Sequence, residues 1–209
     1  MKFQIILATA NPSKARELSA ALADLSLEIQ TLHDFPNLKL PPETGATFEE
    51  NARIKAEFCA RETGLTALAD DSGILVEALP NELGVKTVRF GAGENASDAE
   101  WLAHFLERMK NEKNRRAKFI CVLALARPNE PTKFFRGEVA GEILSEIAAP
   151  ILPRIPLSSV FLADGAERVF AAMSEKEKRE FSHRGRATAL LKKFLENLPL
   201  KKDFAKMQS

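Results

Sequence analysis

The stretch Ala69-Asp70-Asp71-Ser72-Gly73 places two adjacent carboxylates between two apolar runs, Leu65–Ala69 and Ile74–Val76. Because Asp, Ser and Gly are typical turn residues, the pattern predicts a strand, an acidic turn and a second strand. Neighbouring aspartates repel each other, and a fold that keeps both ionised usually supplies a metal ion or a basic side chain. The stretch by itself therefore leaves two interpretations open, a solvated acidic turn and a cation site.

The composition is that of an ordinary globular protein, and it limits the possible functions. The chain has 209 residues, of which 45% are hydrophobic and 28% charged, which suits one large domain or two small lobes. Its 30 Lys and Arg residues nearly balance 29 Asp and Glu residues, so any anion site must be local. We therefore expect no binding to nucleic acid.

The apolar runs and the cysteines indicate where the protein works. No apolar run is long enough for a signal peptide or a membrane span, so we expect no association with a membrane. Cys59 and Cys121 are the two cysteines, and with three histidines they form neither a disulfide framework nor a zinc pattern. This usage predicts a reduced, cytoplasmic setting.

A polar loop, Thr9–Ser13, follows the first predicted strand, Phe3–Ala8, and leads into a helix predicted from Ser13 to about Leu25. The order of strand, polar loop and helix is typical of phosphate binding, because free backbone N–H groups and the helix dipole favour an anion. Lys14 lies in the first helical turn, where a cation is unfavourable for the helix alone. It is either a surface lysine or part of an anion site.

A second helix is predicted over Thr47–Glu62, where Thr47 and Glu50 have the spacing of a capping box. Asn51 and Lys55 are four residues apart within its otherwise apolar face, so both could reach one cleft. The alternative is that Lys55 extends along the surface to solvent, and the spacing alone favours that alternative.

The rest of the chain is expected to add hairpins and helices to this βαβαβ opening. We expect an extended segment Val85–Phe90, a helix Ser97–Met109, strands Ala117–Ala126 and Thr132–Val139, a strand Leu157–Leu162, a helical turn Ser174–Lys178, a loop Glu180–Gly185 and a helix Ala187–Leu198. This order predicts an α/β fold with a mixed twisted sheet, helices on its faces and two lobes flanking a cleft. We expect a single domain over residues 1–198 and a frayed basic tail over residues 199–209.

Several segments resemble, in order, the motifs of a known family. They are Leu7–Leu18, Glu43–Ala56, Ala69–Ile74, Leu83–Phe90, and Glu177-Lys178 with Phe181–Gly185. Together they are similar to the inosine/xanthosine triphosphate pyrophosphatase family, the Ham1/RdgB-like enzymes of non-canonical purine nucleotides. The resemblance covers nearly the whole chain. It implies Mg²⁺-dependent hydrolysis of ITP, dITP and XTP to nucleoside monophosphate and pyrophosphate, in a two-lobed α/β fold with a nucleotide cleft that usually forms a homodimer.

The resemblance also implies roles for individual residues. The catalytic residues would be Asp71, Asp70 and Lys55, the metal ligands Glu43 and Asp71, and the substrate-binding residues Thr9, Asn11, Lys14, Ser72, Lys178, His183 and Arg184. Asp71 would bind the metal and help to activate the water, and Lys55 would neutralise phosphate charge. The chemistry of these residues agrees, because Mg²⁺ takes one or two carboxylates and lysines stabilise the charge of a triphosphate.

One segment departs from the family pattern. Members usually carry Gly-Phe-Gly-Tyr-Asp-Pro, whose Phe and Tyr pack around the base, whereas this chain has Arg154-Ile155-Pro156-Leu157-Ser158-Ser159. A base would lose a stacking partner, worth about 1–3 kcal/mol in nucleic-acid systems. Three hypotheses therefore stay open: the activity of the family, the same chemistry with an altered base preference, and a nucleotide-binding protein without turnover.

Overall fold

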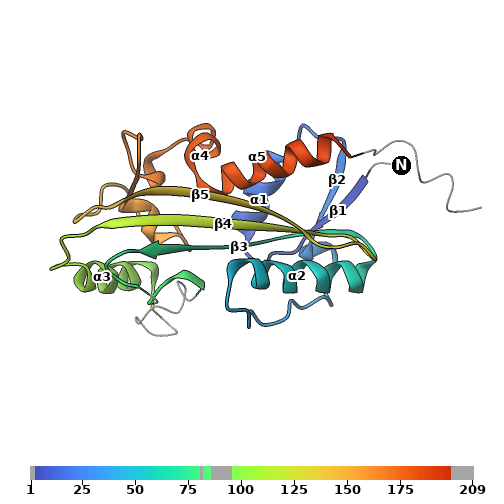
Figure 1. Cartoon of the computed structure of the whole chain (residues 1–209), viewed down its shortest axis with the longest axis horizontal. Coiled ribbons are helices and arrows are strands. Elements are labelled where there is room, and N and C mark those ends of the chain that lie inside the picture. Colours follow the sequence, from blue (N-terminus) through green and yellow to red (C-terminus); the bar gives the residue numbers. More distant parts are fainter. Residues whose placement is uncertain (1–2, 81, 86–95, 199–209) are drawn as a thin grey trace, which may run out of the picture.

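The computed structural model describes residues 3–80, 82–85 and 96–198, which build a six-stranded sheet with helices on its faces (Figure 1). The strands are β1 (Phe3–Leu7), β2 (Leu27–Thr31), β3 (Thr66–Val76), β4 (Arg116–Ala126), β5 (Lys133–Ile143) and β6 (Phe161–Ala163). The helices are α1 (Pro12–Ala21), α2 (Phe48–Thr63), α3 (Asp98–Arg108), α4 (Glu175–Phe181) and α5 (His183–Glu196), with 3₁₀ turns η1 (Leu32–Asp34), η3 (Pro156–Ser159) and η4 (Phe170–Ala172). Residues 86–90 of the expected extended segment, and the tail from residue 199, lie outside the described residues.

The sheet is mixed, as the sequence predicts. Its strand order is β2-β1-β3-β4-β5-β6. β1 runs parallel to β2 and to β3, whereas β3, β4, β5 and β6 are successively antiparallel. No helix in the part of the chain that the structure describes is long and apolar enough to cross a membrane.

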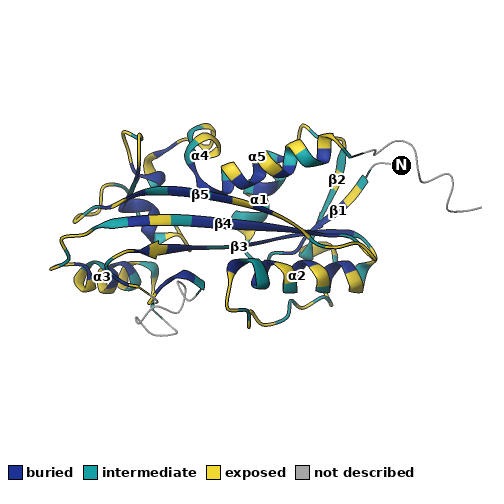
Figure 2. Cartoon of the chain, viewed as in Figure 1, coloured by how far each residue is buried: buried dark blue, intermediate teal, exposed yellow. Residues whose placement is uncertain are grey.

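Helices cover both faces of the sheet, and the core is dense along β3 and β4 (Figures 1 and 2). On one face, α2 packs through Ala52 and Ala56 against alanines of β3. On the other face, Leu18 of α1 and Leu191 of α5 pack against Leu68. A third cluster, built on α3, η3, β6 and η4, fills the far end of the sheet. The division into two lobes and the domain limits at residues 1–198 stay predictions.

β3 is one continuous strand, and the predicted acidic turn within it is wrong. It pairs with β4 in unbroken register from Ala67 opposite Ala126 to Val76 opposite Ala117, so Asp70–Gly73 lies inside the strand. Turn-forming residues adopt an extended backbone here because β4 offers a partner along the whole length, and tertiary context outweighs local preference.

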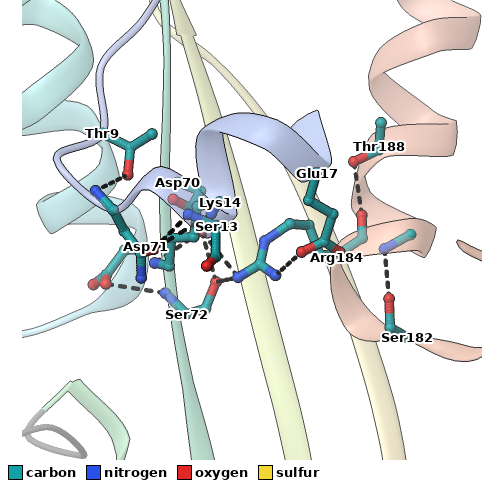
Figure 3. A network of polar contacts seen from close by, with 12 residues as sticks. Thr9, Ser13, Lys14, Glu17, Asp70, Asp71, Ser72, Ser182, Arg184 and Thr188 are labelled. Carbon is teal, nitrogen blue, oxygen red and sulfur yellow. Dashed lines mark hydrogen bonds and ion pairs between the residues drawn. The ribbon is translucent and has the colours of Figure 1, made fainter. Parts of the chain in front are cut away.

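β1 is much shorter than β3, and this difference places the site. β1 pairs with β3 only from Thr66 to Leu68, and the last contact is the hydrogen bond from the N–H of Ala8 to the carbonyl of Leu68. Within the described residues no strand pairs with that edge of β3 beyond this point. The polar loop Thr9–Ser13 leaves the sheet here, so it lies beside Asp70 and Asp71 (Figure 3).

The helix ends confirm some predictions and correct others. The capping box of Thr47 and Glu50 starts α2, which is confirmed. The predicted strand Leu157–Leu162 is wrong, because η3 occupies its first half and β6 its second. The predicted loop Glu180–Gly185 is also wrong: Ser182 is both the C-cap of α4 and the N-cap of α5, so one residue replaces the loop.

Gly137 of β5 allows the first turn of α5 to approach the sheet. A Cβ at this position would lie 2.1 Å from the carbonyl oxygen of His183 and 2.5 Å from the nitrogen of Ala187. Real Cβ atoms do not come so close to backbone atoms, and the backbone of α5 cannot give way locally. The small residue therefore sets the position of His183 and Arg184.

We expect Gly137→Ala to destabilise the protein by about 1–3 kcal/mol or more, because the added methyl group overpacks a backbone contact. Urea unfolding measures this loss. The matched control is Gly64→Ala, where nothing lies within 4 Å of a Cβ and the cost comes from the left-handed φ of +70° alone, about 1–2 kcal/mol. Unchanged stability of Gly137→Ala would contradict the close packing of α5 on β5.

Candidate active site

The two aspartates of β3 point to opposite faces of the sheet, because successive side chains alternate along a strand. Asp70 faces α1 and α5, where it pairs with Lys14 and Arg184 (Figure 3). Asp71 faces α2, and Lys55 of that helix lowers the pKa of Asp71 more than any other basic group does. Each carboxylate therefore has a basic side chain on its own face of the sheet, and the charges of Lys14 and Lys55 act on both carboxylates.

Asp70 is the centre of a buried ionic cluster. Its Oδ2 lies 3.0 Å from Nζ of Lys14 and 3.4 Å from Nη2 of Arg184, and it accepts a hydrogen bond of 3.0 Å from Oγ of Ser72. Burial alone would raise the pKa of Asp70, but Lys14 and Arg184 outweigh burial and hold the pKa below its usual range. Asp70 is thus ionised at neutral pH, and Lys14 is not a plain surface lysine.

Arg184 links α5 to α1 and to β3. Its Nη1 donates to Oε2 of Glu17 at 2.6 Å, while Nη2 faces Asp70. Burial alone would lower the pKa of Arg184, but the two carboxylates raise it above its usual value. Glu17 is not among the residues predicted for the site. Its position one helical turn after Lys14, and so on the same face of α1, was the available signal.

Asp71 carries a carboxylate oxygen without a partner. Its Oδ1 accepts a hydrogen bond of 3.0 Å from the N–H of Ser72, whereas Oδ2 is buried and has no hydrogen-bond partner among the described residues. Burial raises the pKa of Asp71, and Glu43 adds to this effect, although Lys55 and Asn51 oppose it. A buried oxygen of this kind can take up a cation or a proton.

Lys55 is buried, so the prediction that it extends to solvent is wrong. Its Nζ donates to the backbone carbonyl of Asp70 at 2.7 Å and to Oε1 of Glu43. The carbonyl of Asp70 is available because no described strand pairs with β3 at this edge. The Glu43 side chain is 40% exposed, so solvent reaches the carboxylate that Lys55 holds.

The polar loop organises the start of α1. The N–H of Asn11 donates to Oγ1 of Thr9 at 3.2 Å. In turn, Oδ1 of Asn11 accepts from the N–H groups of Ser13 and Lys14 and forms the N-cap of α1. The cap fixes Lys14 in the first turn of a helix whose dipole favours anions, beside the edge of β3.

His183 and Lys178 differ in how they relate to this cluster. His183, the first residue of α5, is buried and stacks on Phe119 with ring centroids 4.9 Å apart. Burial, together with Arg184 and Lys14, lowers the pKa of His183 well below its usual value, so the ring is neutral. Lys178 lies on α4 and pairs with Glu175 of the same helix at 3.1 Å, so the structure does not bring it to Asp70 or Asp71.

The chain is similar to known proteins over nearly its whole length. A model of the Ham1 family matches residues 5–194. The chain belongs to the Ham1 family. It is 44% identical over 192 residues to a dITP/XTP pyrophosphatase of Deinococcus deserti, covering 90% of this chain and 87% of that one. It is 40% identical over 211 residues to a dITP/XTP pyrophosphatase of Thermus thermophilus, covering 98% of each. A solved HAM1 protein of Coxiella burnetii is 36% identical with a TM-score of 0.83, covering 93% of this chain and 98% of that one.

The segment predicted to depart from the family pattern forms a short helical turn in this Ham1 chain. Residues 156–159 form η3, in which the hydroxyl groups of Ser158 and Ser159 donate at 2.6 Å to the carbonyls of Ile155 and Pro156. Leu157 is buried in the third core cluster, whereas Ile155 is 41% exposed. The two serine hydroxyls thus satisfy the backbone of their own turn, and the segment presents an aliphatic side chain to the outside.

We expect the free energy of unfolding to fall as pH decreases below about 6.5, because the unfolded chain protonates His183 there while the folded ring stays neutral. The slope from one histidine is at most about 1.4 kcal/mol per pH unit. His183→Gln is expected to flatten this part of the profile, which urea unfolding between about pH 5 and about pH 7.5 measures. His104→Gln, at an exposed position of α3, should keep the slope of the native protein. An equal slope in both variants would contradict a neutral, buried His183.

Proposed function

We propose that this Ham1 chain hydrolyses non-canonical purine nucleoside triphosphates (ITP, dITP and XTP) to nucleoside monophosphate and pyrophosphate, with Mg²⁺ as cofactor. The observation that carries the proposal is the edge of β3. There Lys14 and Lys55 approach from the two faces of the sheet, beside the unpartnered oxygen of Asp71. Relatives named dITP/XTP pyrophosphatase support the choice of substrate.

The donor set fits Mg²⁺. Asp71 offers a carboxylate oxygen without a partner, and Glu43 offers a partly exposed carboxylate that pairs with Lys55. Mg²⁺ usually keeps several waters and takes one or two protein carboxylates together with substrate phosphates. The described ranges contain no group of three or more His, Cys, Asp or Glu side chains placed to hold a metal, so waters and substrate phosphates would have to supply most of the ligands. When bound, the ion would neutralise charge on the phosphate oxygens.

The side chains divide the remaining chemistry between them. Water supplies an oxygen to the monophosphate, the phosphoanhydride bond between the α- and β-phosphates breaks, and pyrophosphate leaves. Asp71, with its raised pKa, is suited to take the proton from that water. Lys14 and Lys55 would oppose the charge that the transition state places on non-bridging oxygens. Asp70 stays ionised and holds Lys14 and Arg184, so its part is to orient these cations.

The roles of Thr9, Asn11 and Ser72 in substrate binding belong to the same proposal. Hydrogen bonds within the polar loop hold Thr9 and Asn11, and Ser72 donates hydrogen bonds to Asp70 and Asp71. The homodimer and the cytoplasmic location expected from the sequence stay predictions.

Asp71→Asn is expected to lower turnover by about a hundred- to ten-thousand-fold, because the variant loses the proton acceptor. Its stability at neutral pH should equal or exceed that of the native protein, since burial makes the ionised form of Asp71 unfavourable. Pyrophosphate release from ITP with Mg²⁺ and urea unfolding measure the two effects.

The matched control is Asp24→Asn, which removes a surface carboxylate paired with Lys192 and should leave turnover unchanged. Near-native turnover of Asp71→Asn would contradict the role of Asp71 as the proton acceptor. Absence of pyrophosphate release from the native protein with Mg²⁺ would favour a binding protein without turnover.

A second candidate function keeps the chemistry but changes the base preference. The observation that favours it is η3, where the serine hydroxyls are bonded to the backbone and Leu157 is packed in the core. Residues 154–159 contain no aromatic ring and no carboxylate, so they can offer neither to a base. Without a stacking ring, the site would discriminate between purines less strongly than a site with an aromatic ring does.

Ranking kcat/KM over ITP, dITP, XTP, GTP and ATP separates the two candidates. Under the altered preference, the ratios among purines are compressed, and Ile155→Phe raises kcat/KM for ITP by about tenfold, as one restored stacking contact allows. Leu190→Phe, at an exposed leucine on α5, is the control and should change no ratio. Strong preference of the native protein for ITP and XTP would reject the second candidate.

A further inference from the structure

Asn51 of α2 is a polar side chain in the core, with 2% of its surface exposed. Buried amides are expected to have hydrogen-bond partners. Its Oδ1 accepts a hydrogen bond of 2.8 Å from the N–H of Gly45. Its side chain also lies close enough to Asp71 to lower the pKa of that carboxyl group. One side chain is therefore bonded to the loop that carries Glu43 and lies beside Asp71.

The contact at Gly45 is tight. A Cβ on Gly45 would lie 2.8 Å from Oδ1 of Asn51 and 2.6 Å from Cβ of Glu50, so a larger residue would push the segment away from α2. Glu43 lies only two residues before Gly45. Because the chain between them is short, the hydrogen bond at Gly45 limits where the Glu43 carboxylate can lie.

Glu50 holds the same segment in a different way. Its Oε2 accepts from the N–H groups of Ala46 and Thr47 at 2.6 and 3.3 Å, and these hydrogen bonds are exposed. They belong to the capping box that starts α2. Two adjacent residues of α2 thus anchor one loop, but only the buried one, Asn51, also influences Asp71.

We propose that Asn51 is a positioning residue that fixes the distance between Glu43 and Asp71 and thereby sets the affinity of the site for a divalent cation. The amide group suits this task because it combines an acceptor for Gly45 with a donor for a carboxylate. Residues that orient metal ligands in this way typically change metal affinity about 10- to 100-fold when they are removed. The inference rests on the Mg²⁺ part of the proposed function.

The test measures Mn²⁺ binding to the substrate-free full chain by electron paramagnetic resonance. Asn51→Ala and Asn51→Leu, which keeps the branching at Cγ but has no polar atoms, are expected to raise the dissociation constant for Mn²⁺ about 10- to 100-fold. Gly45→Ala perturbs the same contact from the loop and leaves Asn51 in place, so it should weaken Mn²⁺ binding as well. The half-saturating Mg²⁺ concentration for pyrophosphate release should rise in parallel.

Glu50→Ala is the matched control on the adjacent residue. It should lower stability in urea through loss of the capping box, yet bind Mn²⁺ as the native protein does. Native affinity in Asn51→Ala and Gly45→Ala, or equal weakening in Glu50→Ala, would overturn the inference and leave the proposed function intact. Failure of the native protein itself to bind Mn²⁺ would overturn the Mg²⁺ part of the proposed function and this inference together.

Discussion

The structure depends on the solvation of one buried carboxylate. Asp70 lies inside a central strand, and a charge there is tolerated only if other groups replace the water it has lost. α1 supplies Lys14 and α5 supplies Arg184 as partners of the Asp70 carboxylate. Lys55 of α2 donates a hydrogen bond to the backbone carbonyl of Asp70. Removing one partner of such a buried pair typically costs about 3–5 kcal/mol. Three helices far apart in the sequence are thereby held to one residue, and the cationic groups converge.

The same arrangement separates two kinds of chemistry. The cations around Asp70 hold its pKa low, whereas burial and Glu43 raise the pKa of Asp71. Pairs of titratable groups whose environments move their pKa values apart often divide structural and proton-transfer roles between them. Here the division follows from the alternation of side chains along β3. It also follows from the short β1, whose pairing with β3 ends at Leu68, before Asp70 and Asp71.

Local features were predictable from the sequence, and features that depend on distant partners were not. The capping box of Thr47 and Glu50 was predictable because its hydrogen bonds join residues three positions apart. The mixed sheet followed from the order of strands and helices. The acidic turn was wrong because the partner that keeps Asp70–Gly73 extended, β4, lies about 50 residues away, a separation that local patterns do not encode. The burial of Lys55 depends on a carbonyl exposed by the end of β1, and the pairing of Arg184 with Glu17 joins the two ends of the chain.

The alternation of side chains along β3 explains how two aspartates with identical side chains come to have different chemical properties. A shift of β3 by one residue against β4 would exchange the faces of Asp70 and Asp71, and each would meet the other's neighbours. The unbroken pairing from Ala67 to Val76 excludes that shift, since every apolar side chain of the strand would change face as well. The chemical difference between the two aspartates therefore depends on which face of the sheet each position along β3 points to. The hydrophobic core on both faces keeps that assignment fixed, because it fixes the register of the strand.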